Sequence, residues 1–86
     1  MMIHELKCSS SYFDAVWDGR KLFELRYNDR NFAVGDDLLL VEVDDNLQMS
    51  GRRLIAEVTY LLSEFEALLP RFVAMSIHVR QRFSVE

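Results

Sequence analysis

The residues best suited to chemistry lie in one short segment, where a lysine, a glutamate and an arginine follow a glycine. The segment reads Gly19-Arg20-Lys21-Leu22-Phe23-Glu24-Leu25-Arg26. In an extended strand, residues two apart share a face, so Glu24 and Arg26 point to one side and Phe23 and Leu25 to the other. Lys21 precedes them, where the chain leaves the glycine. An acid and two bases on a polar face, backed by an apolar face, indicate a small recognition or reaction site.

Two roles are open to Lys21 and Glu24. A lysine that acts as a general base must be neutral, and a carboxylate beside it stabilises the charged form instead. We therefore expect Lys21 to be a charged binding group, and Glu24 to be the better base if the protein is an enzyme. The alternative is an exposed ion-pair cluster without function, which contributes little to stability.

A second group of polar side chains follows directly. The arginines Arg26 and Arg30 are suited to gripping phosphate with paired hydrogen bonds, and Asn28 to contacting a base edge. Tyr27 is suited to stacking on a base. Trp17 has the same chemistry, but it falls on the apolar face of the preceding helix, so we expect it in the core. A solvated loop is the alternative for this group.

His4 and Lys7 lie near these residues if the first strand adjoins the second, so we include both as binding candidates. His4 and His78 are the only histidines, and Cys8 is the only cysteine. These are too few ligands of the right type for a zinc site, so we predict no metal and no cofactor. Ser9 and its neighbours have no His–Asp partner pair, so no nucleophile triad is predicted.

Size and composition predict one domain spanning residues 1–86, with a thin core. Ten basic and fourteen acidic side chains give a net charge of −4, which argues against bulk coating of nucleic acid. A nucleic-acid role must then depend on a local basic patch. A lone cysteine, no apolar signal core and no membrane-length apolar run predict a cytoplasmic protein that does not enter a membrane.

Hydrophobic periodicity predicts five strands and one main helix. The expected strands cover residues 3–8, 21–26, 38–43, 52–62 and 73–79, and the expected helix covers residues 11–18. Ser11 and Asp14 have the spacing of a capping box, Phe13 and Val16 face inward, and Gly19 ends the helix. Residues 64–69 are expected to form one helical turn, and residues 80–86 a frayed tail or a short extra strand.

Alternation in residues 52–62 places one set of side chains on a single face: Leu54, Ala56, Val58, Tyr60 and Leu62. Phe32 is expected to anchor the loop before Gly35, and Asp36 to bond backbone in the turn there. This order of elements predicts a compact α+β barrel, because closing the sheet removes its exposed edges.

The order of motifs resembles the ASCH domains of the PUA-like superfamily, in particular a short group from bacteria and phages. The resemblance covers roughly residues 3–79. The matching pieces, in order, are His4-Glu5-Leu6-Lys7, Tyr12-Phe13-x-x-Val16, Gly19-x-Lys21-x-x-Glu24-x-Arg26, Asn28-Asp29-Arg30 and Phe32-x-x-Gly35-Asp36. The resemblance implies a small PUA-like mixed β-barrel with a pocket between the first helix and the barrel. Some ASCH proteins hydrolyse acylated cytidine, with the lysine helping to activate water.

This chain departs from the amidohydrolase branch of that family in two ways. A threonine stands there in the position of Glu24, and a catalytic carboxylate comes from a longer segment after the fourth strand. Here that segment is only residues 63–70. Both differences favour binding over hydrolysis.

Three functions therefore remain open. The first is an RNA- or modified-nucleotide-binding module, using Lys21, Glu24, Arg26, Asn28 and Arg30. The second is an amidohydrolase on an acylated nucleoside such as N4-acetylcytidine, with Lys21 and Glu24 as its catalytic residues. The third is a phage-type module that binds a protein partner through acidic residues: Glu42, Asp44, Asp45, Glu57, Glu64 and Glu66. The sequence leaves the oligomeric state open.

Overall fold

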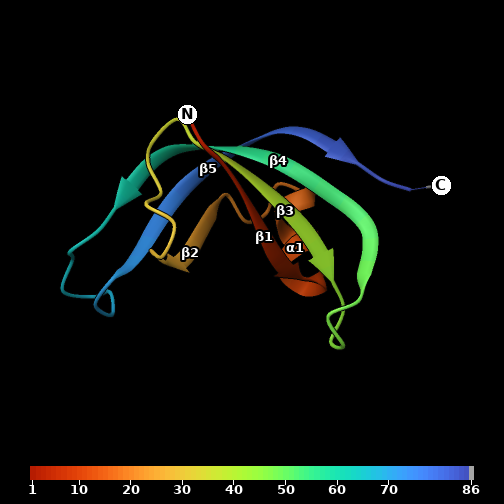
Figure 1. Ribbon diagram of the computed structural model, residues 1–86, viewed down its shortest axis with the longest axis horizontal. Coiled ribbons are helices and arrows are strands. Elements are labelled where there is room, and N and C mark those ends of the chain that lie inside the picture. Colours follow the sequence, from red (N-terminus) through yellow and green to blue (C-terminus); the bar gives the residue numbers. More distant parts are fainter. Residues whose placement is uncertain (86) are drawn as a thin grey trace.

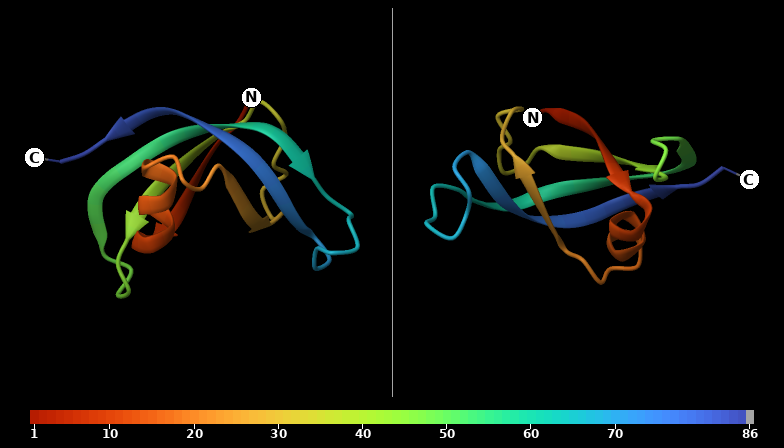
Figure 2. Two further views of the ribbon diagram at one scale, coloured as in Figure 1. Left: turned by 180° about the vertical axis from the view of Figure 1, so that it is seen from behind. Right: turned by 90° about the horizontal axis from the view of Figure 1, so that it is seen from below.

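Five strands form one strongly curved sheet, and a short helix lies in its hollow (Figure 1). The computed structural model describes residues 1–85. The elements in chain order are β1 (Ile3–Ser9), α1 (Ser10–Trp17), β2 (Phe23–Tyr27), β3 (Asp37–Val43), β4 (Met49–Leu62) and β5 (Phe72–Phe83). The long strands β4 and β5 arch over α1 and β2, as the view from behind shows (Figure 2).

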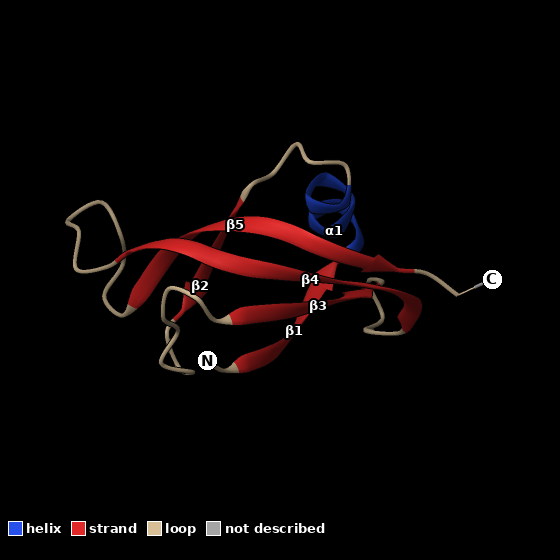
Figure 3. Cartoon of the chain, turned by 90° about the horizontal axis from the view of Figure 1, so that it is seen from above, coloured by secondary structure: helices blue, strands red, loops and turns tan. Residues whose placement is uncertain are grey.

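The sheet is mixed and has the strand order β1-β3-β4-β5-β2. β1 pairs with β3 in parallel, and the other neighbours are antiparallel. The predicted α+β architecture is confirmed, but the sheet is a half-barrel, not the closed barrel that we expected. β1 and β2 are its two edges, and no ladder joins them. Arginine side chains from β2 and from the loop after it cross to β1 instead. Seen from above, the β4–β5 loop and the C-terminal end lie at opposite ends of the sheet (Figure 3).

The core lies between α1 and the inner face of the sheet. Phe13 and Val16 are fully buried, which confirms the predicted inward face of the helix. Trp17 is only partly buried and packs on Phe13, with 5.7 Å between the ring centroids. The strands supply the other large buried side chains of the core centre: Leu38, Leu40, Leu54, Val58, Val73 and Met75.

The alternation predicted for β4 holds only for its first part. Leu54, Ala56 and Val58 are fully buried, but Tyr60 is 62% exposed. A register shift between Val58 and Tyr60 marks a β-bulge opposite β5. One extra residue in a strand moves every later side chain to the other face, so Leu61 packs inward in place of Leu62.

The helix begins one residue earlier than predicted, at Ser10, and its capping differs. Ser9 is the N-cap residue and makes no side-chain capping bond, so the capping box of Ser11 and Asp14 is wrong. The predicted end is confirmed: Gly19 has a φ of +79°, and its N–H donates to the Val16 oxygen. Glycine adopts this left-handed conformation without strain, which lets the chain turn toward β2.

One further local prediction is wrong, because residues 64–69 form turns and no helix, and Glu64 has a positive φ of 54°. Of the two alternatives for the tail, strand structure is found up to Phe83, as a continuation of β5. β4 pairs with this part of β5 as far as Phe83. Phe83 pairs with Arg53, and Glu86 lies outside the described residues.

The turn before β3 is tied to the N-terminal strand by Asp36. Its carboxylate accepts hydrogen bonds from the backbone N–H groups of Met2 and Ala33, as predicted, and from His4 Nε2 at 2.8 Å. The bond from His4 holds the pKa of the Asp36 carboxyl below its usual range. His4 is 5% exposed and packs edge-on against Phe32, at 4.8 Å between centroids. His4 is therefore a structural residue, and its prediction as a ligand-binding residue is not supported by its position.

The ion pairs of Arg52 link the helix to the sheet. Arg52 on β4 donates from Nε and Nη2 to the two oxygens of Glu42 on β3, at 2.9 and 2.8 Å, and it also pairs with Asp14 on α1. The guanidinium lies 5.1 Å from the ring centroids of both Phe13 and Trp17. Glu42 is 5% exposed, so these contacts replace the water that its charge has lost.

This ion pair makes the free energy of unfolding depend on pH. The bonds from Arg52 lower the pKa of Glu42 from 4.5 to about 2. A carboxyl with a lowered folded-state pKa stabilises the fold above about pH 4.5, and that contribution, about 3 kcal/mol, is lost as the pH falls toward 2. Urea unfolding at pH 7, 4 and 3 should show this loss, and a Glu42→Gln variant should show a flatter pH dependence. An equal dependence in both proteins would contradict the assignment.

Candidate functional site

A pocket of about 540 Å³ opens between the two edge strands of the half-barrel. We call this place the seam. Its walls are residues 7–9 of β1, Tyr12 of α1, Lys21 of the connecting loop and residues 23–26 of β2. The volume lies in the range typical of small-molecule sites. The seam thus exists because β1 and β2 are both edges, and it brings together parts of the chain from residues 7 to 26.

The centre of the seam is a carboxylate held between two cations. Glu24 is 3% exposed; its Oε1 accepts from Lys21 Nζ at 2.6 Å and its Oε2 from Arg26 Nε at 2.8 Å. Lys21 Nζ also donates to the Phe23 oxygen at 2.7 Å. Buried charges are tolerated when they are paired and fully hydrogen-bonded. The short distances confirm that the spacing of Lys21, Glu24 and Arg26 builds one cluster.

The orientation of β2 is the reverse of what its sequence suggests. Glu24 is buried and Arg26 half-buried toward the seam, whereas Phe23 and Leu25 are 51% and 52% exposed. An edge strand over an open seam has no second apolar layer outside it. The two cations beside Glu24 make its burial possible, so the polar face turns inward. The apolar face is therefore presented to solvent.

Aromatic rings stand beside the cations of the seam. Lys21 Nζ lies 4.8 Å from the centroid of the Phe23 ring and 5.8 Å from that of Tyr12. Tyr12 is 63% exposed, so one side of its ring is open to a ligand. The seam therefore combines positive charge with flat apolar surface.

Two arginines cross the seam and bind the backbone of β1. Arg26 Nη2 donates to the Lys7 oxygen at 3.1 Å, and Arg30 Nη1 donates to the Glu5 oxygen at 2.9 Å. An edge strand leaves such carbonyl groups without a strand partner, and side-chain donors satisfy them here. Arg30 consequently serves to hold the two edges together, and it does not line the pocket.

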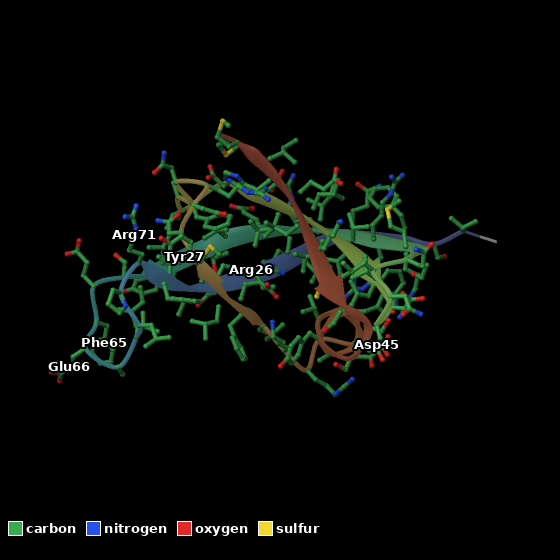
Figure 4. All side chains as sticks on the ribbon, turned by 60° about the horizontal axis from the view of Figure 1, so that its bottom comes forward. Arg26, Tyr27, Asp45, Phe65, Glu66 and Arg71 are labelled. Atoms are coloured by element: carbon green, nitrogen blue, oxygen red, sulfur yellow. The ribbon has the colours of Figure 1, made fainter. Side chains whose placement is uncertain are left out.

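The remaining predicted residues are divided between the seam and other places. Lys7 lines the pocket with Lys21, Glu24 and Arg26. Asn28 is a turn residue, since its Oδ1 accepts from the Phe32 N–H at 3.0 Å. Tyr27 lies at the far end of β2, with Arg71 above its ring (Figure 4). Asn28 and Arg30 therefore do not line the pocket with Lys21, and their role in binding stays a prediction.

Cys8 also lines the pocket, but its thiol is a poor nucleophile. The side chain is 4% exposed, and burial, reinforced by the charge of Glu24, raises its pKa from 9.0 to about 11. The thiolate is the reactive form of cysteine. Cys8 therefore acts as a small apolar wall residue at neutral pH.

The sequence reasoning missed three features of the site. Ser9 and Tyr12 line the pocket because α1 follows β1 without a loop. Arg52 positions the helix, and thereby Tyr12, from a strand far along the chain. The Tyr12-Phe13-x-x-Val16 motif carried a signal for Tyr12, but pairing of Arg52 with Glu42 has no local signature.

No group of three or more His, Cys, Asp or Glu side chains within residues 1–85 is arranged to hold a metal ion. Over the same range, no helix has the length and apolar character needed to cross a membrane.

Comparison with known proteins gives one family and one curated relative. The family described as "Domain of unknown function (DUF3850)" matches residues 3–77. A protein of Escherichia phage P2, described as an uncharacterized 12.9 kDa protein in the GpA 3' region, is 42% identical over 57 residues. The match covers 66% of this chain and 51% of the phage protein, so the chain spans about half the length of that relative.

Proposed function

Because the chain belongs to the DUF3850 family, whose description assigns no function, we propose its function from the seam itself: it binds an RNA segment or a modified nucleotide. The observation that carries this proposal is the charge of the seam. The pocket walls carry three cations, Lys7, Lys21 and Arg26, and one carboxylate, Glu24, which leaves a formal charge of +2; Lys21 and Arg26 bond Glu24 directly. The whole chain has a net charge of −4, so this local excess is directed at an anion.

The donors of the seam are not all used within the protein. An ammonium group has three N–H donors and a guanidinium has five. Lys21 donates two of its three to Glu24 and Phe23, and Arg26 donates two of its five to Glu24 and Lys7. The remaining donors are available for phosphate oxygens. Tyr12 and Phe23 offer the apolar faces on which a base stacks.

The same site supports a proposed relationship to the ASCH domains of the PUA-like superfamily. The resemblance implies a mixed β-barrel with a pocket between the first helix and the barrel, and this chain has a mixed half-barrel with a pocket that α1 helps to line. A nucleotide ligand and the unpaired Cys8 thiol suit a cytoplasmic protein, and we place it there as part of this proposal.

Salt dependence provides the first test. With up to three phosphate contacts, the slope of log affinity against log salt concentration should be about −2 at most, because each contact to a single strand adds about −0.7. Titration of a labelled oligonucleotide at several salt concentrations measures this slope. Retained affinity with a slope near zero would point to non-ionic recognition, and a much steeper slope to an extended basic surface.

One observation favours an amidohydrolase as the second candidate. Lys21 Nζ and Glu24 Oε1 are 2.6 Å apart in the wall of the pocket, where an acylated nucleoside would contact both. Against this role, both oxygens of Glu24 already accept hydrogen bonds from Lys21 and Arg26, so neither is free to take a proton from an attacking water. Binding therefore remains the leading proposal, and the first experiment of the Discussion separates the two.

A further inference from the structure

A second surface adjoins the seam on the outer side of the sheet. In antiparallel pairs, residues directly opposite each other share a face. Phe23 lies opposite Ser76, which lies opposite Tyr60; Leu25, Ala74 and Leu62 form the next row, and Tyr27 and Phe72 the last. We call these eight residues the outer face. It contains no charged side chain.

The outer face is exposed and rich in aromatic rings. Phe23, Tyr27 and Tyr60 are 51%, 47% and 62% exposed, and Leu25 between the first two is 52% exposed. An apolar surface of this kind on a soluble domain marks an interaction site more often than chance exposure. Phe23 and Leu25 also line the seam pocket, so the two surfaces are continuous.

Each end of β2 carries a cation over an aromatic ring. Lys21 Nζ is 4.8 Å from the Phe23 centroid, and Arg71 Cζ is 5.9 Å from the Tyr27 centroid. The rings of Tyr27 and Phe72 also meet edge to face at 5.7 Å. Figure 4 shows Tyr27 and Arg71 at the end of β2 next to the β4–β5 loop. Phe23 and Tyr27 are four residue steps apart along β2, and this corresponds to a distance of about 13 Å.

We propose that the natural ligand is a single-stranded oligonucleotide, with one phosphate in the seam and its neighbouring bases stacked on the outer face. This inference rests on the proposed function. At about 3.4 Å per nucleotide, 13 Å corresponds to about four stacked nucleotides, and to fewer in a stretched strand. A mononucleotide fills the seam alone, and a longer strand reaches Tyr27.

The chemistry of the two surfaces matches this ligand. A single strand has anionic phosphates on one side and flat apolar bases on the other, and the seam and the outer face offer the corresponding partners side by side. Glu64 and Glu66 stand near Arg71 around a neighbouring hollow. We therefore expect stacking, and not phosphate contact, to hold the bases at the Tyr27 end.

A length series tests the proposal. The affinities of AMP and of two-, four- and six-nucleotide RNA and DNA strands are measured for the parent, Tyr27→Leu and Tyr60→Leu. Phe83→Leu is the matched control, because Phe83 is an aromatic residue at the other end of β5. Thermal unfolding checks the fold of each variant. Stacking of one base contributes about 1–3 kcal/mol, so the parent should bind four nucleotides about 5- to 150-fold more tightly than AMP.

In this experiment, Tyr27→Leu should lose most of the gain with length and keep its affinity for AMP. The salt slope should stay nearly constant from one to four nucleotides. Binding of AMP without any gain in affinity as the strand lengthens would overturn the inference and leave the proposed function standing. If neither AMP nor any strand binds, both are overturned. A dimer that Tyr27→Leu and Tyr60→Leu disrupt, without any length effect, would assign the outer face to protein contact and also overturn the inference. Equal gains for RNA and DNA identify the shared single-strand chemistry; a gain for RNA alone points to contacts with the 2′-hydroxyl.

Discussion

Glu24→Gln should leave nucleotide binding unchanged or strengthen it by up to about tenfold. The substitution removes the one negative charge of the seam and releases Lys21 and Arg26 from it, so the formal charge rises from +2 to +3. Tenfold corresponds to about 1.4 kcal/mol. Glu57→Gln is the matched control, because it changes the net charge of the chain equally at a partly exposed position of β4 outside the pocket. Weaker binding of Glu24→Gln alone would show that the carboxylate accepts a hydrogen bond from the ligand, such as that of an exocyclic amine.

The same variant decides between binding and catalysis. If Glu24 is a general base, Glu24→Gln should retain substrate affinity and lose turnover of N4-acetylcytidine by about 10²–10⁴-fold. Lys21→Ala should weaken ligand capture in either case and therefore does not separate them. Absence of turnover by the parent protein across a panel of acylated nucleosides would exclude the hydrolase alternative.

Arg52→Ala should cost about 2–4 kcal/mol of unfolding free energy. The substitution leaves Glu42 buried without its cation and releases Asp14 of α1. Breaking a fully buried pair costs about 3–5 kcal/mol, and we expect somewhat less here because the Arg52 side chain is 31% exposed. Small domains are stable by only about 5–15 kcal/mol, so the loss is a large share of the total. Guanidinium unfolding at pH 7 measures it.

Two controls make the Arg52 experiment specific. Arg53→Ala removes the neighbouring, exposed arginine and should cost less than about 1 kcal/mol. The double variant Glu42→Leu with Arg52→Leu removes both charges and should lose less than Arg52→Ala. Equal losses for Arg52→Ala and Arg53→Ala would show that the ion pair does not fasten the helix. Because α1 carries Tyr12 to the seam, we also expect Arg52→Ala to weaken nucleotide binding.

Local pattern in the sequence determined most of the elements and the centre of the site. The 3.6-residue spacing of Phe13 and Val16 and the glycine at position 19 determine the helix, because both act within a few residues. The spacing of Lys21, Glu24 and Arg26 determines their cluster for the same reason, since these side chains reach one another within a single strand and its entry.

Only the tertiary structure decided which way that cluster faces and what surrounds it. The alternation of β2 is the same whether Glu24 or Phe23 faces inward; the position of β2 at the edge of an open half-barrel selects Glu24. The bulge after Val58 turns Tyr60 outward, onto the same face of the sheet as Phe23, and only the register of β4 against β5 reveals it. Likewise, His4 bonds to Asp36 and Arg52 bonds to Glu42, although the partners lie far apart in the sequence. Such pairings depend on strand order and register, and these are set by the packing of the whole core and not by any short segment.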